Sequence, residues 1–297
     1  MNKNIYILGF AFLSITFIAC EDTITVDSGF ETPQLVVDAW IENVEGSEQT
    51  IAVTWTQDYF DNRLPTPIED AIVTVSNGNK TFDFVYNEDG TYQFQLEEGE
   101  AFGEIGDVIS LSVIHDGKEY NSSTQIYRTA VIDSIRFYIE DGAFGSDSGT
   151  YAEVYAKDPA GFGDSYWIRT FKNDTLLTRP QEINLAYDAA FNEGTNLDGT
   201  YFISPIRFAV NPLDDDGIPT DWKLGDKIRV EVHSISNAAF RFMQTVQEQA
   251  TNGDNSIFAL PVANARSNIS LAGNPDERIL GFFNVASVAA AEKTVTE

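Results

Sequence analysis

The 297-residue sequence contains one cysteine, two histidines, and far fewer basic than acidic side chains. The single cysteine, Cys20, excludes an intrachain disulfide, so the fold must depend on the burial of its core. The histidines, His115 and His233, occur in no HExxH motif and in no paired metal-ligand spacing. No apolar run reaches the ~20 residues that a membrane-spanning helix needs.

Basic side chains are scarce. There are 18 Lys and Arg against 46 Asp and Glu, a formal charge of −28. Without residues 1–19 the count becomes 17 against 46, a charge of −29. Such a field repels nucleic acid and anionic membrane surfaces. We therefore expect no nucleic-acid partner, and membrane attachment through lipid. The 43% hydrophobic and 12% aromatic content is too high for a disordered chain.

The N-terminus has the pattern of a bacterial lipoprotein signal. Lys3 precedes the apolar run Ile5–Ala19, which has the length of a secretory h-region and ends at Cys20. Ala19 and Cys20 are the small residue and the cysteine that signal peptidase II requires, whereas Phe17 stands where Leu is usual. We expect cleavage after Ala19 and lipidation of Cys20. The alternatives are a signal peptide with an incidental cysteine, or a short buried helix.

Residues 20–33 are expected to form a lipidated tether. Glu21 and Asp22 resemble the acidic surface-export signal of Bacteroidota lipoproteins, which would place the body outside the cell. The next residues are mostly Thr, Asp, Ser, Gly and Pro, and thirteen extended residues reach roughly 45 Å. Each buried acyl methylene contributes ~0.8 kcal/mol of membrane affinity, so we expect firm attachment to the outer membrane.

Residues 34–128 have the pattern of a β-sandwich domain. Segments rich in β-branched and aromatic residues lie at 34–41, 50–56, 71–77, 81–86, 91–96, 109–113 and 119–127. Asn77-Gly78 and Asp116-Gly117 are favoured hairpin turns. Short strands at this spacing favour an immunoglobulin-like β-sandwich. The A-x-V-x-V pattern at 71–75 and the G-x-Y pattern at 90–92 resemble transthyretin-like or carboxypeptidase-regulatory-like sandwiches, which are binding or structural modules.

Residues 129–297 are expected to form a second β domain with one helix. Its expected strands are 134–140, 151–157, 166–172, 201–210 and 227–235, with residues 173–200 as a surface link.

The helix is expected at about 237–252. Ala239, Met243, Val246 and Ala250 recur at helical spacing, with Asn237 and Gly253 as caps. The run Ile279–Val288 is expected to close the second domain, and the residues from about Ala290 to fray.

The order of several short motifs resembles one family. These are LVVDAWI, PIEDAIVTVSNG, GTYQF, GEIGDVISLSVIHDGKEYNSST, VIDSI, WKLGDKIRVEVHSIS and NARSNISLAGNPDERILGFFNVASV. Together they resemble an uncharacterised Bacteroidota outer-membrane lipoprotein family, domain of unknown function four-two-four-nine. The resemblance implies a role beside TonB-dependent receptors, next to which members are often encoded. It supplies no catalytic residues.

No motif indicates an enzyme. There is no G-x-S-x-G elbow, and Gly161-Phe162-Gly163 lacks the third glycine and the following helix of a phosphate loop. A Ser-His-Asp site through His115 or His233 stays open. We expect no catalytic residue and no cofactor.

Asp214, Asp215 and Asp216 concentrate the oxygen ligands that Ca²⁺ prefers. Counting back from Gly217, however, the first EF-hand position falls on Pro212, which has no carboxylate. An acidic turn is therefore favoured over a metal site.

Three tripeptides match the Asp-Ser/Thr-apolar pattern that Bacteroidota periplasmic enzymes O-glycosylate. They make Thr23, Ser134 and Thr175 candidate modification sites, although so short a pattern also arises by chance.

The tryptophans offer a further candidate surface, since indole rings stack on sugars. Trp40, Trp55 and Trp167 lie in expected strands, where alternation sends large rings into the core. Trp222 lies in a loop and is the best candidate for an exposed contact, but an anchoring role is favoured.

The favoured function is a surface-exposed outer-membrane lipoprotein that acts as an accessory or binding subunit of a TonB-dependent nutrient uptake system. The alternative is a free-standing surface binding module for glycans or host proteins.

Overall fold

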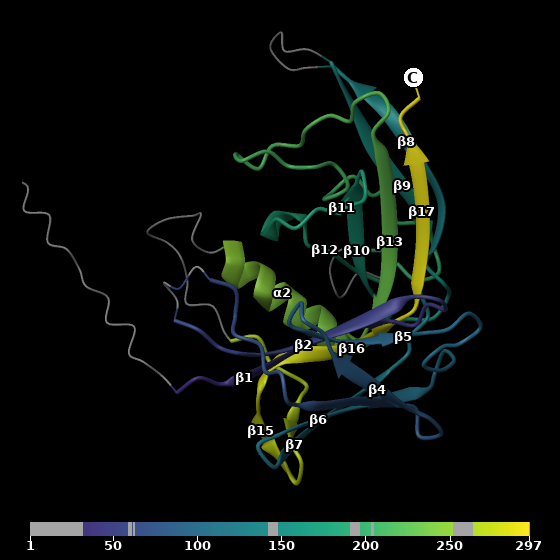
Figure 1. Cartoon of the computed structure of the whole chain (residues 1–297). Helices are drawn as coiled ribbons and strands as arrows, with labels where there is room; N and C mark the ends of the chain where they lie inside the picture. The colour runs from purple at the N-terminus through teal and green to yellow at the C-terminus, as the bar shows by residue number, and fades with distance from the viewer. Residues whose placement is uncertain are drawn as a thin grey trace, which may run out of the picture. The chain divides into compact units, whose positions relative to one another are not determined.

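The computed structural model describes residues 32–58, 61, 63–141, 148–190, 197–202, 205–251 and 264–296. The chain divides into one unit of Met1–Thr32 with Gln57–Arg63, and a second of Pro33–Thr56 with Leu64–Glu297. In the first, Arg63 pairs with Asp61 at 2.6 Å. The second contains all the described strands and is mainly β (Figure 1), which confirms the predicted fold class. No helix in the described ranges is long and apolar enough to cross a membrane.

A ten-stranded sheet takes strands from both ends of the chain. Seven come from the N-terminal part: β1 (Leu35–Glu42), β2 (Glu48–Trp55), β3 (Ile72–Ser76), β4 (Thr81–Tyr86), β5 (Thr91–Gln95), β6 (Val108–His115) and β7 (Lys118–Gln125). Three follow the helix: β14 (Ser270–Leu271), β15 (Asn274–Arg278) and β16 (Leu280–Ala286). The order is β15-β14-β7-β6-β3-β4-β5-β2-β1-β16, and β16 runs parallel to β1.

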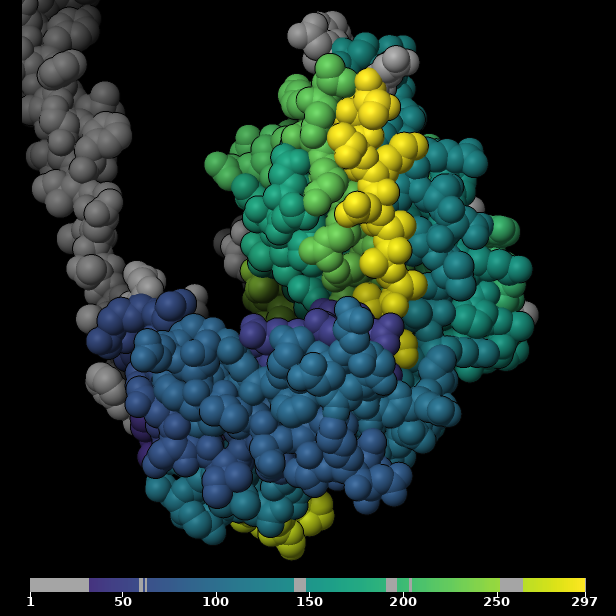
Figure 2. All heavy atoms as spheres, turned by 45° about the vertical axis from the view of Figure 1, so that its right-hand side comes forward, coloured from purple at the N-terminus to yellow at the C-terminus, as the bar shows by residue number. Residues whose placement is uncertain are grey.

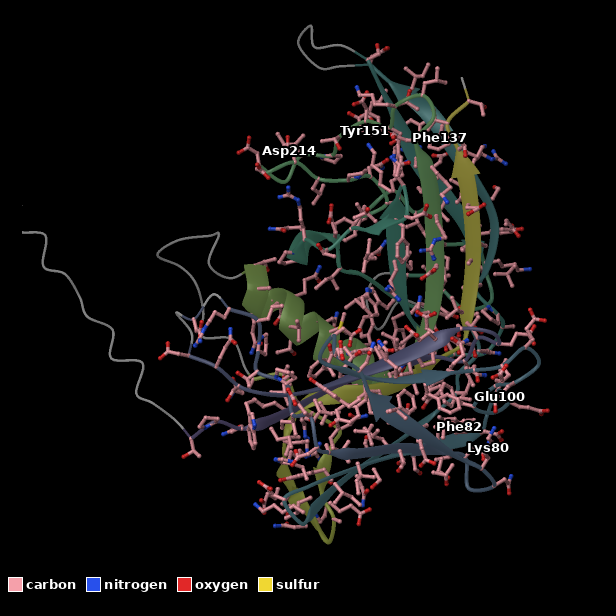
Figure 3. The ribbon with its side chains drawn as sticks, in the orientation of Figure 1. Lys80, Phe82, Glu100, Phe137, Tyr151 and Asp214 are labelled. Atoms are coloured by element: carbon pink, nitrogen blue, oxygen red, sulfur yellow. The ribbon has the colours of Figure 1, made fainter. Side chains whose placement is uncertain are left out.

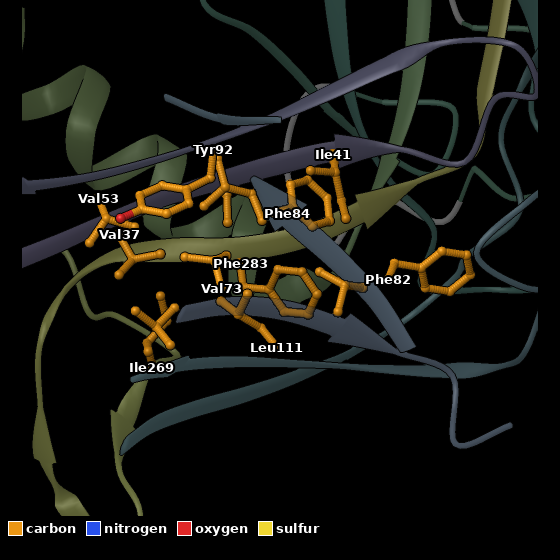
Figure 4. Close-up of a cluster of buried hydrophobic side chains, with 14 of the residues drawn as sticks. Val37, Ile41, Val53, Val73, Phe82, Phe84, Tyr92, Leu111, Ile269 and Phe283 are labelled. Atoms are coloured by element: carbon orange, nitrogen blue, oxygen red, sulfur yellow. The ribbon is translucent and has the colours of Figure 1, made fainter. Parts of the chain in front are cut away.

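The core of this sheet follows the alternation of its strands. In β4, Phe82 and Phe84 are buried while Thr81 and Asp83 are exposed. Figure 4 shows these rings with aliphatic side chains of β1, β2, β3 and β6 and with Phe283 of β16. The hydroxyl of buried Tyr92 keeps its hydrogen bonds. It donates to the Ile68 carbonyl at 2.7 Å and accepts from the Ala71 N–H at 2.8 Å.

A second sheet has five strands: β10 (Ser165–Lys172), β11 (Thr175–Leu176), β12 (Asn184–Tyr187), β13 (Lys227–Ile235) and β17 (Val288–Thr294). Its order is β11-β10-β13-β17, and β12 also pairs with β10. β8 (Val131–Glu140) and β9 (Gly149–Lys157) form a separate two-stranded ribbon. Figure 2 shows β17, in yellow, on the surface beside this ribbon.

Helix α2 (Asn237–Thr251) confirms the predicted helix and packs at the place where the two sheets meet. Ala239, Phe240 and Met243 share a buried cluster with Phe282 of β16 and Leu185 of β12. The predicted cap is wrong by one residue. The Ser236 hydroxyl accepts the Ala239 N–H at 3.0 Å, whereas the Asn237 side chain accepts a hydrogen bond from Ser165. Gly253, the predicted C-terminal cap, lies outside the described residues.

Most predicted strands form within a few residues of their predicted bounds, and those at 81–86 and 227–235 match them. The strand predicted at 201–210 is wrong. Only isolated bridges join Tyr201 and Ile206 to β9, and residues 208–210 form a turn. The surface link predicted at 173–200 is also wrong in part. It contains β11, the 3₁₀ helix η3 (Pro180–Glu182) and β12, whose Asn184 and Ala186 are fully buried.

The C-terminal predictions need two corrections. The run Ile279–Val288 was expected to close the second domain, but its β16 part joins the ten-stranded sheet through β1. The residues from Ala290 were expected to fray, but they pair with β13 as far as Thr294. In both cases the pairing strand lies far away in sequence. The division into domains 34–128 and 129–297 stays a prediction.

Gly281 is the point of closest approach between β16 and β1. Its φ is +97°, and it pairs in register with Val37. A Cβ at this position would lie 1.9 Å from the Val37 carbonyl oxygen. The parallel pairing therefore requires glycine here, both for its backbone conformation and for space.

Gly281→Ala is expected to destabilise the protein by roughly 3 kcal/mol or more, because it combines left-handed strain with a backbone clash. Gly273→Ala is the matched control. Its φ is +80°, but nothing lies within 4 Å of its would-be Cβ, so it should cost only about 1–2 kcal/mol. Urea unfolding measures both, and equal losses would contradict the clash.

Candidate functional site

The N-terminal site residues lie outside the described part of the chain. These are Cys20, Glu21, Asp22 and Thr23. Lipidation, the export signal and O-glycosylation at Thr23 stay predictions.

The two other candidate O-glycosylation residues lie on strands. Ser134 is half-buried in β8, and Thr175 is exposed in the short strand β11. Thr175 is thus the more accessible hydroxyl. Modification of both residues stays a prediction.

Asp214 lies in a loop on the surface (Figure 3), and the Asp214–Asp216 segment has the hydrogen bonds of a closed turn. One Asp214 carboxylate oxygen accepts the N–H groups of Asp216 at 3.0 Å and Ile218 at 2.9 Å. Asp215 pairs with Arg179 at 2.7 Å. These contacts favour the acidic turn over a calcium site.

The tryptophans are buried in the reverse of the expected order. Trp222, in the loop, is 1% exposed, and its indole N–H donates to Asn211 at 3.0 Å. The favoured anchoring role is therefore confirmed. The strand residues Trp40, Trp55 and Trp167 are only half-buried, so the expectation that they enter the core was too strong.

Both histidine rings contact carboxylates. His115 has Asp70 3.2 Å from Nδ1 and Asp116 3.4 Å from Nε2. The Nε2 atom of His233 lies 3.0 Å from Glu231. Among the described residues, no serine hydroxyl is hydrogen-bonded to either ring, so the structure assembles no Ser-His-Asp site there.

His233 belongs to a charged cluster between the two sheets. Glu231 Oε2 lies 3.0 Å from its ring, and Glu42 of β1 lies 3.9 Å away. Arg169 pairs with Glu42 at 2.9 Å, and Arg229 pairs with Glu231. Because two guanidinium groups balance the two carboxylates, the cluster fits a structural role better than a metal centre. The adjoining space is about 10 Å³, enough for a water molecule at most.

A second cluster consists of three buried carboxylates, Asp158, Asp164 and Asp188. Asp164 receives the Arg128 guanidinium, with Nη2 at 2.6 Å. Asp158 accepts the Tyr166 hydroxyl at 2.5 Å, and burial raises the pKa of both groups.

The Asp188 carboxylate also has hydrogen-bond partners, since it accepts the backbone N–H groups of Gly163 and Asp164 at 2.7 and 2.9 Å. Three carboxylates beside one guanidinium leave an excess of negative charge, and Ca²⁺ binds to such groups of carboxylate oxygens. A cation could enter only if Arg128 moved away, so the cluster favours a structural role.

Two hollows open on sheet faces, and no sequence motif marked them. The first, about 570 Å³, is lined largely by uncharged polar side chains of β3, β6, β7 and residues 268–270. The second, about 440 Å³, lies against the β8–β9 ribbon and is lined by Asp133, Ser134, Arg136, Tyr155, Tyr201, Phe202 and Pro205. Tyr155 in YAEVYAK could have marked an aromatic strand face from the sequence alone. Tyr201 comes next to that strand only in the fold, through its bridge to Lys157.

Comparison with known proteins identifies one family. The model of a family described as a domain of unknown function (DUF4249) matches residues 21–292 and so confirms the resemblance. No curated protein matches the chain.

Millimolar Ca²⁺ is expected to raise the melting temperature by no more than about a degree, because the Asp214 carboxylate already accepts two backbone N–H groups and the Asp215 carboxylate is paired with Arg179. Thermal unfolding with and without Ca²⁺ measures this. A rise of several degrees that Asp214→Asn with Asp216→Asn abolishes would overturn the acidic-turn interpretation.

The free energy of unfolding is expected to fall as the pH drops from about 6.5 to about 4, the interval between the pKa values of His233 in the unfolded and the folded protein. Burial and the nearby Arg169 and Arg229 lower its pKa to about 4, against the attraction of Glu42. The unfolded ring, with a pKa near 6.5, takes up its proton first. Stability is therefore unaffected above about pH 6.5, and is lost by up to roughly 3 kcal/mol on the way down to pH 4.

Urea unfolding between about pH 7 and 4.5 tests this, with His233→Gln as the variant that cannot titrate. The variant should lose less stability over this range than the parent protein. Equal losses would show that other groups carry the effect.

Proposed function

We propose, on the premise that the chain belongs to the DUF4249 family, that it is a lipid-anchored outer-membrane protein serving a TonB-dependent receptor as an accessory or binding subunit. The single observation that carries this proposal is the N-terminal sequence. An apolar run ends at Cys20, and Glu21 and Asp22 follow directly. The first strand of the described residues, β1, begins at Leu35, and in this proposal the residues between Cys20 and β1 are the lipidated tether.

The hollow on β3, β6 and β7 supports a protein contact. Ten residues line it, and all are uncharged in a chain with a formal charge of −28. Exposed Ile72 and Val108 continue the same strands. Depletion of charge is typical of the centre of a protein–protein interface, because ionised side chains are costly to desolvate there. We define the uncharged face as the lining residues of these three strands, which are Thr74, Ser76, Ser110, Leu111, Ser112, Asn121, Ser122 and Ser123; Glu119, which accepts the Ser112 hydroxyl, lies at its border.

The alternative function is a free-standing surface module that binds glycans or host proteins. The second hollow favours the glycan form of this alternative, because it places tyrosine rings beside hydrogen-bonding groups.

The test is a mild-detergent pull-down of the native lipoprotein, with Cys20→Ala as the unanchored control. We expect stoichiometric recovery of one large outer-membrane β-barrel protein. Adding Ser110→Glu and Ser123→Glu, both on exposed positions of the uncharged face, should reduce recovery at least tenfold, equivalent to about 1.4 kcal/mol.

Thr294→Glu is the surface control and should leave recovery unchanged, because Thr294 is exposed on the other sheet. Recovery of the lipoprotein alone from well-solubilised membranes would refute the accessory role and favour the free-standing module.

A further inference from the structure

The hollow against the β8–β9 ribbon is built from three chain segments. β8 and β9 pair so that Ser134 lies opposite Tyr155 and Arg136 lies opposite Glu153. On the other edge of β9, the Phe202 N–H donates to the Ala156 carbonyl at 3.2 Å, and Val154 and Ile206 exchange two backbone hydrogen bonds. Side chains of all three segments face the hollow.

Aromatic rings provide the apolar part of its wall. Tyr201 is 53% exposed, Tyr155 is half-buried, and Phe202 is buried beneath. The Asp133 carboxylate beside the Tyr201 hydroxyl raises the pKa of that hydroxyl. An exposed tyrosine ring offers a flat surface, and flat aromatic surfaces pack on the C–H face of a pyranose.

Two cations beside these rings have no carboxylate partner. Arg136 lies over the Tyr155 ring at 4.5 Å, and Lys157 lies over the Tyr201 ring at 5.8 Å. Among the described residues, no carboxylate oxygen is within ion-pair distance of either side chain. Glu153 is near Arg136, but it is taken by Arg207 at 2.8 Å and by the Tyr155 hydroxyl at 2.7 Å.

Among the described residues, Arg136 and Lys157 belong to the minority of cations that form no ion pair. Most of the protein's Lys and Arg side chains are paired, as Arg128 is with Asp164, Arg169 with Glu42 and Lys172 with Asp226. With 46 acidic side chains competing for 18 basic ones, Arg136 in the hollow and Lys157 beside Tyr201 are two cations against one lining carboxylate, Asp133. Such a site complements an anion.

We propose that this hollow binds an acidic sugar residue, with its ring against Tyr201 and Tyr155 and its acidic group paired with Arg136 and Lys157. Ser134 and Asp133 lie where they can hydrogen-bond sugar hydroxyls. The volume of about 440 Å³ is within the range of small-ligand sites. The acidic group is a carboxylate, as in a uronic acid, or a sulfate ester. This inference goes beyond receptor association and does not depend on it.

The test is titration calorimetry of the detergent-solubilised full chain with trigalacturonate, a sulfated chondroitin oligosaccharide and neutral maltotriose, with EDTA present to exclude metal bridging. We expect an acidic sugar to bind at least tenfold more tightly than maltotriose. Which of the two acidic probes binds identifies the acidic group.

Tyr201→Ala and Arg136→Ala should each weaken that binding at least tenfold, and Arg136→Lys should restore part of it. Tyr151→Ala, on the same ribbon outside the hollow, and Lys118→Ala, an exposed cation on the ten-stranded sheet, are the controls and should bind normally. Unchanged melting temperatures establish that the variants are folded.

The proposal is overturned if neither acidic probe binds, if maltotriose binds equally well, or if the two hollow variants bind as the parent does. A negative result in the sugar titrations would not change the expected recovery of the receptor in the pull-down. The two proposals can therefore be refuted independently.

Discussion

The parallel pairing of β16 with β1 is the constraint on which the rest of the structure depends. It joins Val36–Glu42 to Leu280–Ala286, so the ten-stranded sheet is complete only when both ends of the chain are present. One residue later the same segment enters β17 and completes the second sheet against β13. Ser287 fixes this crossing, because its carbonyl accepts the Ser234 N–H and its own N–H donates to the Ser234 hydroxyl, both at 2.9 Å. The two sheets therefore share one continuous backbone segment.

Side chains around this crossing hold the sheets together in two ways. Trp40 of β1 meets Trp167 of β10 edge to face at 5.6 Å, and both pack against the cluster that α2 completes. Beside them, Arg169 pairs with Glu42 across the sheets. A partly buried pair adds little net stability, since desolvation offsets attraction, but removal of one partner leaves an unpaired charge. The aromatic contacts thus supply most of the attraction, and the ionic cluster favours one arrangement.

The sequence predicted what depends on local pattern and missed what depends on distant partners. Alternation and turn residues were sufficient for β4 and β13, and helical spacing for α2. The position of β16 was missed because no local feature of LGFFNVA specifies β1 as its partner. Trp222 shows a related limit, since its burial depends on Asn211, which accepts its N–H. The candidate lipidation residue Cys20 could be proposed from the sequence because its motif is contiguous, and its lipidation stays a prediction. The sugar hollow could not be proposed in this way, because β8, β9 and Tyr201 come together only in the fold.

The scarcity of basic residues makes their positions informative. In a chain of balanced charge, an arginine without a carboxylate partner is ordinary, because an exposed ion pair is worth little. Here carboxylates outnumber cations by more than two to one, so a cation that forms no ion pair is available to an outside anion. Arg136 lines the hollow and Lys157 lies over the Tyr201 ring beside it, while the nearby Glu153 is paired with Arg207. The overall charge repels anions at long range, but salt limits that repulsion to ~8 Å. An anion that reaches the hollow is therefore governed by the two local cations rather than by the net charge.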